Sequence, residues 1–138
     1  MYYKIKVIES KIDEGKDVKI SHDLLVTSES YTDAEAKAFK FIEENGMANS
    51  EVNSISKYSL SLAKDFQESE DSKYFKSQVE LHFDNNGKIQ VVKKNYIVGT
   101  ESISQAIDCS LKLAQEFSGA KAFFVKSVQE TPFKELIG

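Results

Sequence analysis

An alternation of apolar and polar positions opens the chain. Apolar side chains occupy every second position from residue 3 to residue 7, with lysines between them: Tyr3, Lys4, Ile5, Lys6 and Val7. This period of two is typical of a strand that buries one face. We therefore expect a strand whose odd-numbered side chains enter the core and whose even-numbered side chains face solvent.

A turn and a second strand are expected next. Residues 13–16 read Asp-Glu-Gly-Lys, which favours a tight turn, and apolar positions resume over 18–28. His22 interrupts those apolar positions, which predicts a bend or bulge at that point. The pattern then changes to the spacing of a helix, with Thr-Asp-Ala-Glu at 32–35 as its capping box, and a last strand is expected over 52–60.

The whole pattern occurs twice. A shift of 72 superimposes Tyr2 on Tyr74, Lys4 on Lys76, Val7 on Val79, Gly15 on Gly87, Val26 on Val98 and Ala34 on Ala106. After one inserted residue Gly46 falls on Gly119, and residues 52–55 fall on 125–128. The second helix cap is expected at 102–105, two residues before the position that matches the first cap. Lys94 interrupts the apolar positions of its strand at the place that matches His22. The sequence thus predicts an α+β fold made of two ββαβ units, mainly antiparallel, with one helix each.

We interpret residues 1–138 as a single domain made of two repeats. The first repeat spans 1–60, an acidic connector spans 61–72, and the second repeat spans 73–138 with a C-terminal tail from 131. In the tail, Phe133, Leu136 and Ile137 stand at helical spacing. Such a segment would cover the core or reach a partner.

Composition indicates in which kind of compartment the protein resides. Its 138 residues carry a formal net charge of −4 and one cysteine, Cys109, which cannot form a disulfide within the chain. A reducing compartment is favoured. Since no apolar run reaches the length of a signal peptide or a membrane span, we expect a soluble cytoplasmic protein without membrane contact.

The chain carries no catalytic signature. Ser21, His22 and Asp23 are consecutive in a predicted strand and cannot form a triad, and the segment 84–88 lacks the spacing of a calcium loop. Two histidines and one cysteine without ligand spacing predict no metal site. We therefore expect a non-enzyme with no metal and no small-molecule cofactor.

The solvent-facing side of the predicted strands carries aromatic rings and lysines in both repeats. The side chains expected on this face are Tyr2, Lys4, Lys6, Lys19, Tyr74, Lys76 and Lys93. Rings that stack on bases and ammonium groups that meet phosphates are what single-stranded nucleic acid requires, with about 1–3 kcal/mol per stacked base. A structural role is the alternative, because lysines also protect sheet edges and outward tyrosines also pack against other surfaces.

Three segments resemble a family of small proteins of unknown function from Bacteroides-type bacteria, their phages and mobile elements. They are residues 30–36, which read Ser-Tyr-Thr-Asp-Ala-Glu-Ala, Tyr-Phe-Lys at 74–76 and Glu-Thr-Pro-Phe at 130–133. The chain departs from that family at 24–26, where Leu-Leu-Val replaces Tyr-Leu-Val. The resemblance implies phage or mobile-element biology in a bacterial host cell and supplies no catalytic residues.

Two functions follow as hypotheses. The first is a non-catalytic single-stranded DNA-binding protein, open to homo-oligomerisation, in which the tyrosines stack and the lysines neutralise phosphate. The second is a protein-interaction or assembly module, such as a phage accessory or host-takeover factor, that uses the same face or the tail and binds no nucleic acid.

Overall fold

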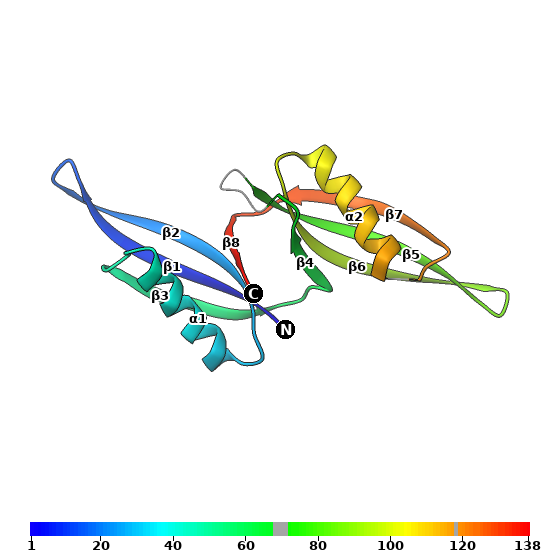
Figure 1. Ribbon diagram of the computed structural model, residues 1–138, viewed down its shortest axis with the longest axis horizontal. Helices are drawn as coiled ribbons and strands as arrows, with labels where there is room; N and C mark the ends of the chain where they lie inside the picture. Colours follow the sequence, from blue (N-terminus) through cyan, green and yellow to red (C-terminus); the bar gives the residue numbers. More distant parts are fainter. Residues whose placement is uncertain (68–71, 118) are drawn as a thin grey trace. The chain divides into compact units, whose positions relative to one another are not determined.

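The computed structural model describes residues 1–67, 72–117 and 119–138. Over these residues the chain forms two helices and eight strands (Figure 1). In chain order they are β1 (Tyr2–Asp13), β2 (Lys16–Thr27), α1 (Tyr31–Glu44), β3 (Ser50–Tyr58), β4 (Leu62–Asp65), β5 (Lys73–Asn85), β6 (Lys88–Thr100), α2 (Ile103–Phe117), β7 (Ala122–Glu130) and β8 (Phe133–Ile137). The predicted α+β fold is confirmed, and each repeat has one more strand than the predicted ββαβ unit.

The chain divides into two compact units. One consists of Met1–Ser59 and Phe133–Gly138, and the other of Leu60–Pro132. Their sheets have the strand orders β3-β1-β2-β8 and β4-β6-β5-β7. Each sheet is antiparallel except for its added strand, because β8 pairs parallel with β2 and β4 pairs parallel with β6. Each repeat therefore gives its last strand to the sheet of the other repeat.

The added strands correct two predictions. Part of the predicted connector, Leu62–Asp65, is β4, while residues 68–71 of it lie outside the described residues. The tail is strand β8, so its helical spacing is misleading, but Phe133 is buried and Ile137 packs against the first core, in line with the expectation that the tail covers the core. Five residues are too few for helical spacing to be informative, and the pairing that orders the tail comes from β2, far away in the sequence.

The two hairpin turns are confirmed. β1 and β2 are joined at Glu14-Gly15, and β5 and β6 at Asn86-Gly87. All four residues have positive φ, between 50° and 83°. Two consecutive residues of positive φ define the turn whose twist matches that of antiparallel strands.

The predicted bulge at His22 and Lys94 is wrong. The pairing of β1 with β2 and of β5 with β6 continues through both positions without a shift. Register shifts lie instead in the partner strands: in β3 and β7, opposite Lys6/Val7 and Gln78/Val79, and in β8, opposite Asp23/Leu24. His22 is accommodated in a regular strand because its Nε2 atom lies 3.2 Å from Oε1 of the buried Glu9.

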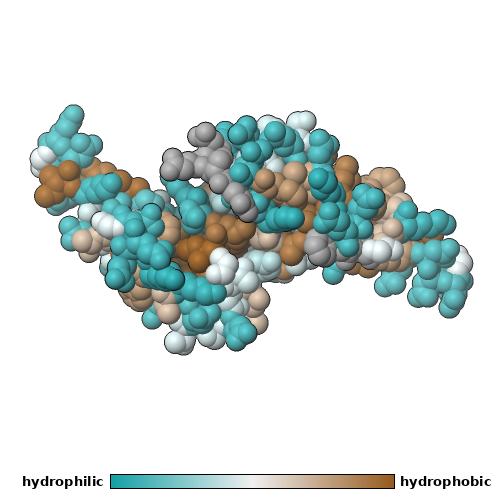
Figure 2. Space-filling model, viewed as in Figure 1, coloured by the Kyte–Doolittle hydropathy of each residue, from teal (hydrophilic) through white to brown (hydrophobic). Residues whose placement is uncertain are grey.

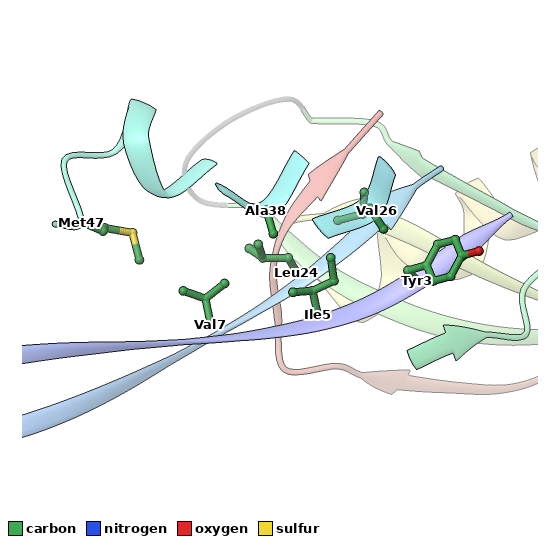
Figure 3. Packing of buried hydrophobic residues seen from close by; sticks show 8 residues of the cluster. Tyr3, Ile5, Val7, Leu24, Val26, Ala38 and Met47 are labelled. Carbon is green, nitrogen blue, oxygen red and sulfur yellow. The ribbon is translucent and has the colours of Figure 1, made fainter. Parts of the chain in front are cut away.

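Each unit has its own hydrophobic core between its helix and one face of its sheet. In the first unit, Tyr3, Ile5 and Val7 from β1 point to the same side as Leu24 and Val26 from β2, toward the helix (Figure 3). The second core contains Phe75, Val79, Leu81, Tyr96, Val98, Ala106, Leu113 and Ala114. The predicted inward faces of β1 and β5 are confirmed, and this face of each sheet is called the helix-covered face below.

The helix caps are equivalent in the two repeats. Ser30 Oγ accepts a hydrogen bond from the backbone N–H of Asp33 at 3.1 Å, and Ser102 Oγ accepts one from Gln105 at 3.3 Å. The predicted cap at Thr32 is wrong, because the cap is Ser30, two residues earlier. The predicted offset of two residues between the caps of the two repeats is therefore wrong as well. Ser30 provides the oxygen that the first turn of the helix needs, one residue before the helix begins.

Candidate nucleic-acid interface

The face of each sheet opposite its helix, called the open face, carries the predicted residues. Tyr2, Lys4 and Lys6 are half-buried on the open face of the first sheet, where Lys19 is exposed. Lys76 and Lys93 lie on the open face of the second sheet, half-buried and exposed respectively. The alternation of the strands therefore predicted the orientation of all six residues correctly.

Tyr74 is the exception, because its ring is buried. Only 6% of Tyr74 is exposed, and its hydroxyl donates a hydrogen bond to Oδ2 of Asp65 at 2.8 Å. Asp65 and Tyr74 flank Gly99 in one row across β4, β6 and β5. A Cβ atom at Gly99 would lie 2.6 Å from Oδ1 of Asp65, so this glycine leaves the space that the carboxylate occupies. Tyr74 has no ring face available to a base.

An exposed ring does lie on this face, at Phe124. It is 49% exposed, and its centroid is 5.2 Å from that of His82 with the ring planes at 68°. Phe124 pairs with Glu80, which pairs on its other side with Lys93, so the three residues form one row. Sequence reasoning missed Phe124, although Phe123 and Phe124 are adjacent in a strand and only one of them can face the core.

The charges around Phe124 are mainly positive. Glu80 contacts His82 Nε2 at 2.8 Å and Lys126 Nζ at 3.8 Å, and Lys121 Nζ lies 3.9 Å from a carboxylate oxygen of Asp84. The hydrogen bond from His82, helped by Lys126 and Lys93, lowers the pKa of Glu80. Glu80 is therefore a carboxylate near neutral pH, and its charge is offset by its neighbours.

We define the Phe124 patch by the exposed or half-exposed side chains around this ring. They are His82, Val91, Lys93, Lys121, Phe124 and Lys126. Val91 is 50% exposed and pairs with His82 in the row next to Phe124. Three lysines against Glu80 and Asp84 make this face positive, although the chain as a whole carries −4.

Exposed apolar side chains also occur elsewhere. At the end of the first hairpin, Ile12 is 79% exposed, and Figure 2 shows hydrophobic surface beside hydrophilic surface along this hairpin. On the helices, Tyr31 and Phe39 of α1 correspond by the 72-residue shift to Ile103 and Leu111 of α2. Residues eight apart lie about 80° from one another around a helix axis, so these positions share one side of each helix.

Other chemistry has little support among the described side chains. No group of three or more His, Cys, Asp or Glu residues in the described part of the chain is placed to hold a metal ion. Cys109 is half-buried on α2, and burial raises the pKa of its thiol. A protonated thiol is a poor nucleophile at neutral pH. Neither of the two helices, over their described residues, has the length and apolar character to cross a bilayer.

Fold and surface together define a duplicated α+β protein with one exposed aromatic-and-lysine face. The chain belongs to the family described as "Domain of unknown function (DUF4494)", which it matches over residues 1–137. No curated protein matches the chain. The family description assigns no activity.

Proposed function

We propose that this protein is a non-catalytic single-stranded DNA-binding protein that uses the Phe124 patch on the open face of the second sheet. The observation that supports this proposal is the exposed Phe124 ring next to His82, in one row with Lys93. A base stacks on the free face of Phe124, and Lys93, Lys121 and Lys126 meet the phosphates on either side.

The second sheet supports this role better than the first. On the open face of the first sheet, Lys4, Lys6 and Lys19 are present, but the predicted ring there, Tyr2, is half-buried. Stacking needs an accessible ring face, whereas phosphate contacts need only a cation near the surface. The lysines of the first sheet therefore supply charge without a stacking platform.

The proposed setting is the cytoplasm of a bacterial host cell, in phage or mobile-element biology. It rests on the resemblance of residues 30–36, 74–76 and 130–133 to proteins from such sources. A small protein that coats or marks single-stranded DNA fits the replication of these elements.

Binding of a fluorescein-labelled oligo-dT at low salt, followed by fluorescence anisotropy, tests the proposal. Phe124→Ala should weaken binding roughly 5- to 150-fold, which corresponds to the loss of one stacked base. The matched control is Phe39→Ala on α1, because Phe39 is also a phenylalanine with 52% exposure but belongs to a helix and not to the Phe124 patch. The proposal is lost when the wild-type protein does not bind, or when both variants weaken binding equally.

A second candidate function is a protein-interaction module that docks through the helix flanks, here with another copy of the chain. The observation that favours it is the exposed apolar side chains on both helices: Tyr31 and Phe39 are 47% and 52% exposed on α1, and Ile103 and Ile107 are 51% and 36% exposed on α2. Tyr31 and Ile103 correspond by the 72-residue shift, and exposed apolar side chains on both helices suit a contact with another protein surface.

The oligomeric state distinguishes this candidate. Sedimentation velocity should give a mass above that of one chain, and Ile107→Lys should lower it. Ile89→Lys is the control, because Ile89 is 56% exposed on the β5–β6 hairpin and not on a helix. A monomeric wild-type protein at high concentration would exclude this candidate and leave the first one untouched.

A further inference from the structure

The outer edge of the β1–β2 hairpin is the strongest unassigned surface of the first unit. β8 pairs with β2 only from Asp23 to Val26, so Lys16–His22 has no strand on that side in the described part of the chain. Figure 1 shows that the end of this hairpin extends beyond α1. We propose that two copies of the chain pair through this edge, as two antiparallel β2 strands related by a two-fold axis at Val18. This contact goes beyond the proposed DNA-binding function and does not depend on it.

The backbone groups of the odd-numbered residues of β2 point to this edge. Directly after β2, the N–H of Ser28 donates to the carbonyl of Met1 on the β1 side. Backbone groups alternate in direction along a strand, and the pairing of β1 with β2 has no register shift, so the even-numbered residues of β2 bond to β1. Asp17, Lys19 and Ser21 therefore direct their N–H and C=O groups outward, where an edge strand can receive a further strand.

Two opposite charges on this edge are unused within the chain. Asp17 pairs with Ile12 and Lys19 pairs with Ser10, so both side chains lie on the open face of the first sheet. Both are exposed, and neither makes an ion pair with a side chain in the described residues. They stand two residues apart on the same strand, on either side of Val18.

These charges select one register among those that the backbone allows. A two-fold contact uses the same surface on both copies, so the pattern has to complement itself. With the axis at Val18, Asp17 of each copy faces Lys19 of the other, and each of these pairs exchanges two backbone hydrogen bonds. With the axis at Asp17 or at Lys19, like charges face each other directly, which is destabilising. The occupant that fits this edge is therefore a second copy of the same edge.

The length of the free edge also fits a second copy. With the axis at Val18, the hairpin turn at Glu14-Gly15 of one copy falls opposite Ser21 and His22 of the other. The added strand thus ends before Asp23, where β8 begins to pair with β2. A contact of one short strand pair buries little surface, so we expect a weak dimer that forms at high protein concentration.

The second hairpin does not repeat these charges. At the positions of Asp17 and Lys19, the 72-residue shift places Ile89 and Val91. Charge reversal at Asp17 or Lys19 therefore tests the first hairpin alone, and Ile89→Lys makes a matched change in the second.

Charge reversal tests the proposal on the full-length protein. Asp17→Lys brings lysines to face lysines, and Lys19→Asp brings aspartates to face aspartates. Each variant alone should therefore dimerise roughly 2- to 30-fold more weakly than the wild type. An equimolar mixture of the two variants should dimerise about as well as the wild type, because each lysine then faces an aspartate. Sedimentation equilibrium measures these affinities, and Ile89→Lys should leave the wild-type affinity unchanged.

A cysteine at the axis reports the register. In a Cys109→Ser background, Val18→Cys places two thiols at a pair without hydrogen bonds between the copies, whose Cα atoms lie about 4.5 Å apart. This distance suits a disulfide, so oxidation by air and copper phenanthroline should link two chains. Ile20→Cys is the control and should link few chains, because residue 20 faces Lys16 of the other copy.

Four results would overturn the proposal. The first is a wild-type protein that stays monomeric at high concentration, and the second is a mixture that dimerises no better than the separate variants. The third is a dimer weakened by Ile89→Lys or Ile107→Lys, which would assign the contact to the second hairpin or to the helices. The fourth is equal crosslinking of Val18→Cys and Ile20→Cys. Circular dichroism of each variant verifies its fold, which exposed charges on a hairpin affect little.

Discussion

At the scale of single residues, Gly99 shows how one missing side chain positions two others. The Asp65 carboxylate occupies the space over Gly99 and accepts the hydroxyl hydrogen bond of Tyr74. Gly99→Ala should therefore destabilise the protein by roughly 1–3 kcal/mol, since the new methyl group would meet Asp65 at 2.6–2.8 Å. Urea unfolding of the variant measures this change.

A double-mutant cycle identifies the cause. Asp65→Ala alone should also destabilise the protein, because it removes the acceptor of Tyr74 and of the Gln67 N–H. The double variant should cost less than the sum of the two single changes, since the methyl group then meets no carboxylate. Additive effects would show that Asp65 does not occupy the space over Gly99.

Glu80 provides a prediction about pH. Its folded-state pKa is lowered from 4.5, chiefly by the hydrogen bond from His82. A lowered carboxyl pKa adds stability above the unfolded value, and this stability is lost as pH falls through the folded value. Between pH 5 and pH 3, Glu80→Gln should therefore lose less stability than the wild type in urea unfolding. An equal or larger loss in the variant would contradict the pairing with His82.

Single residues also show where sequence reasoning succeeds. The inward positions of β1 and β5 follow from alternation alone, because a strand points successive side chains to opposite faces. The burial of Tyr74 could not be predicted in this way. Its partner Asp65 comes from β4, which joins the sheet from the other repeat, and the acidic composition around Asp65 suggested a connector.

At the scale of elements, the two helix caps are the most directly comparable features. Ser30 and Ser102 stand 72 residues apart and make the same type of hydrogen bond. Ser30→Ala and Ser102→Ala should each destabilise the protein by about 0.5–2 kcal/mol. Thr32→Ala is the control, because Thr32 lies inside α1 and caps nothing. Thermal unfolding in which Thr32→Ala has the larger effect would contradict the assignment of the caps.

The exchanged strands explain why the elements could be predicted only in part. After the inserted residue, the two repeats are related by a shift of 73, and this shift continues beyond the last predicted strands. Residues 60–65 therefore correspond to residues 133–138. β4 and β8 are thus repeated elements, but their sequences share few residue types. Their pairing with β6 and β2 is parallel and distant along the chain, and no local pattern specifies such a partner.

At the scale of the whole chain, the residues that build the fold are duplicated, but the residues of the proposed binding surface are not. Buried positions recur in both repeats, whereas the Phe124 patch does not. Phe124 corresponds to Glu51, His82 to Ser10 and Lys93 to Ser21. A search for features present in both copies therefore detects the core and the caps but passes over a surface that only one copy has acquired.

The most direct test of DNA binding by the Phe124 patch is a map of the DNA contact by NMR. Unlabelled oligo-dT is added to isotopically labelled protein, and the shift of each backbone amide is followed. If DNA binds the Phe124 patch, the largest shifts should lie in β5, β6 and β7 around His82, Lys93 and Phe124, and they should decrease as salt is raised. Shifts confined to the helices or to the first sheet would contradict binding at this patch, as would a spectrum that DNA leaves unchanged.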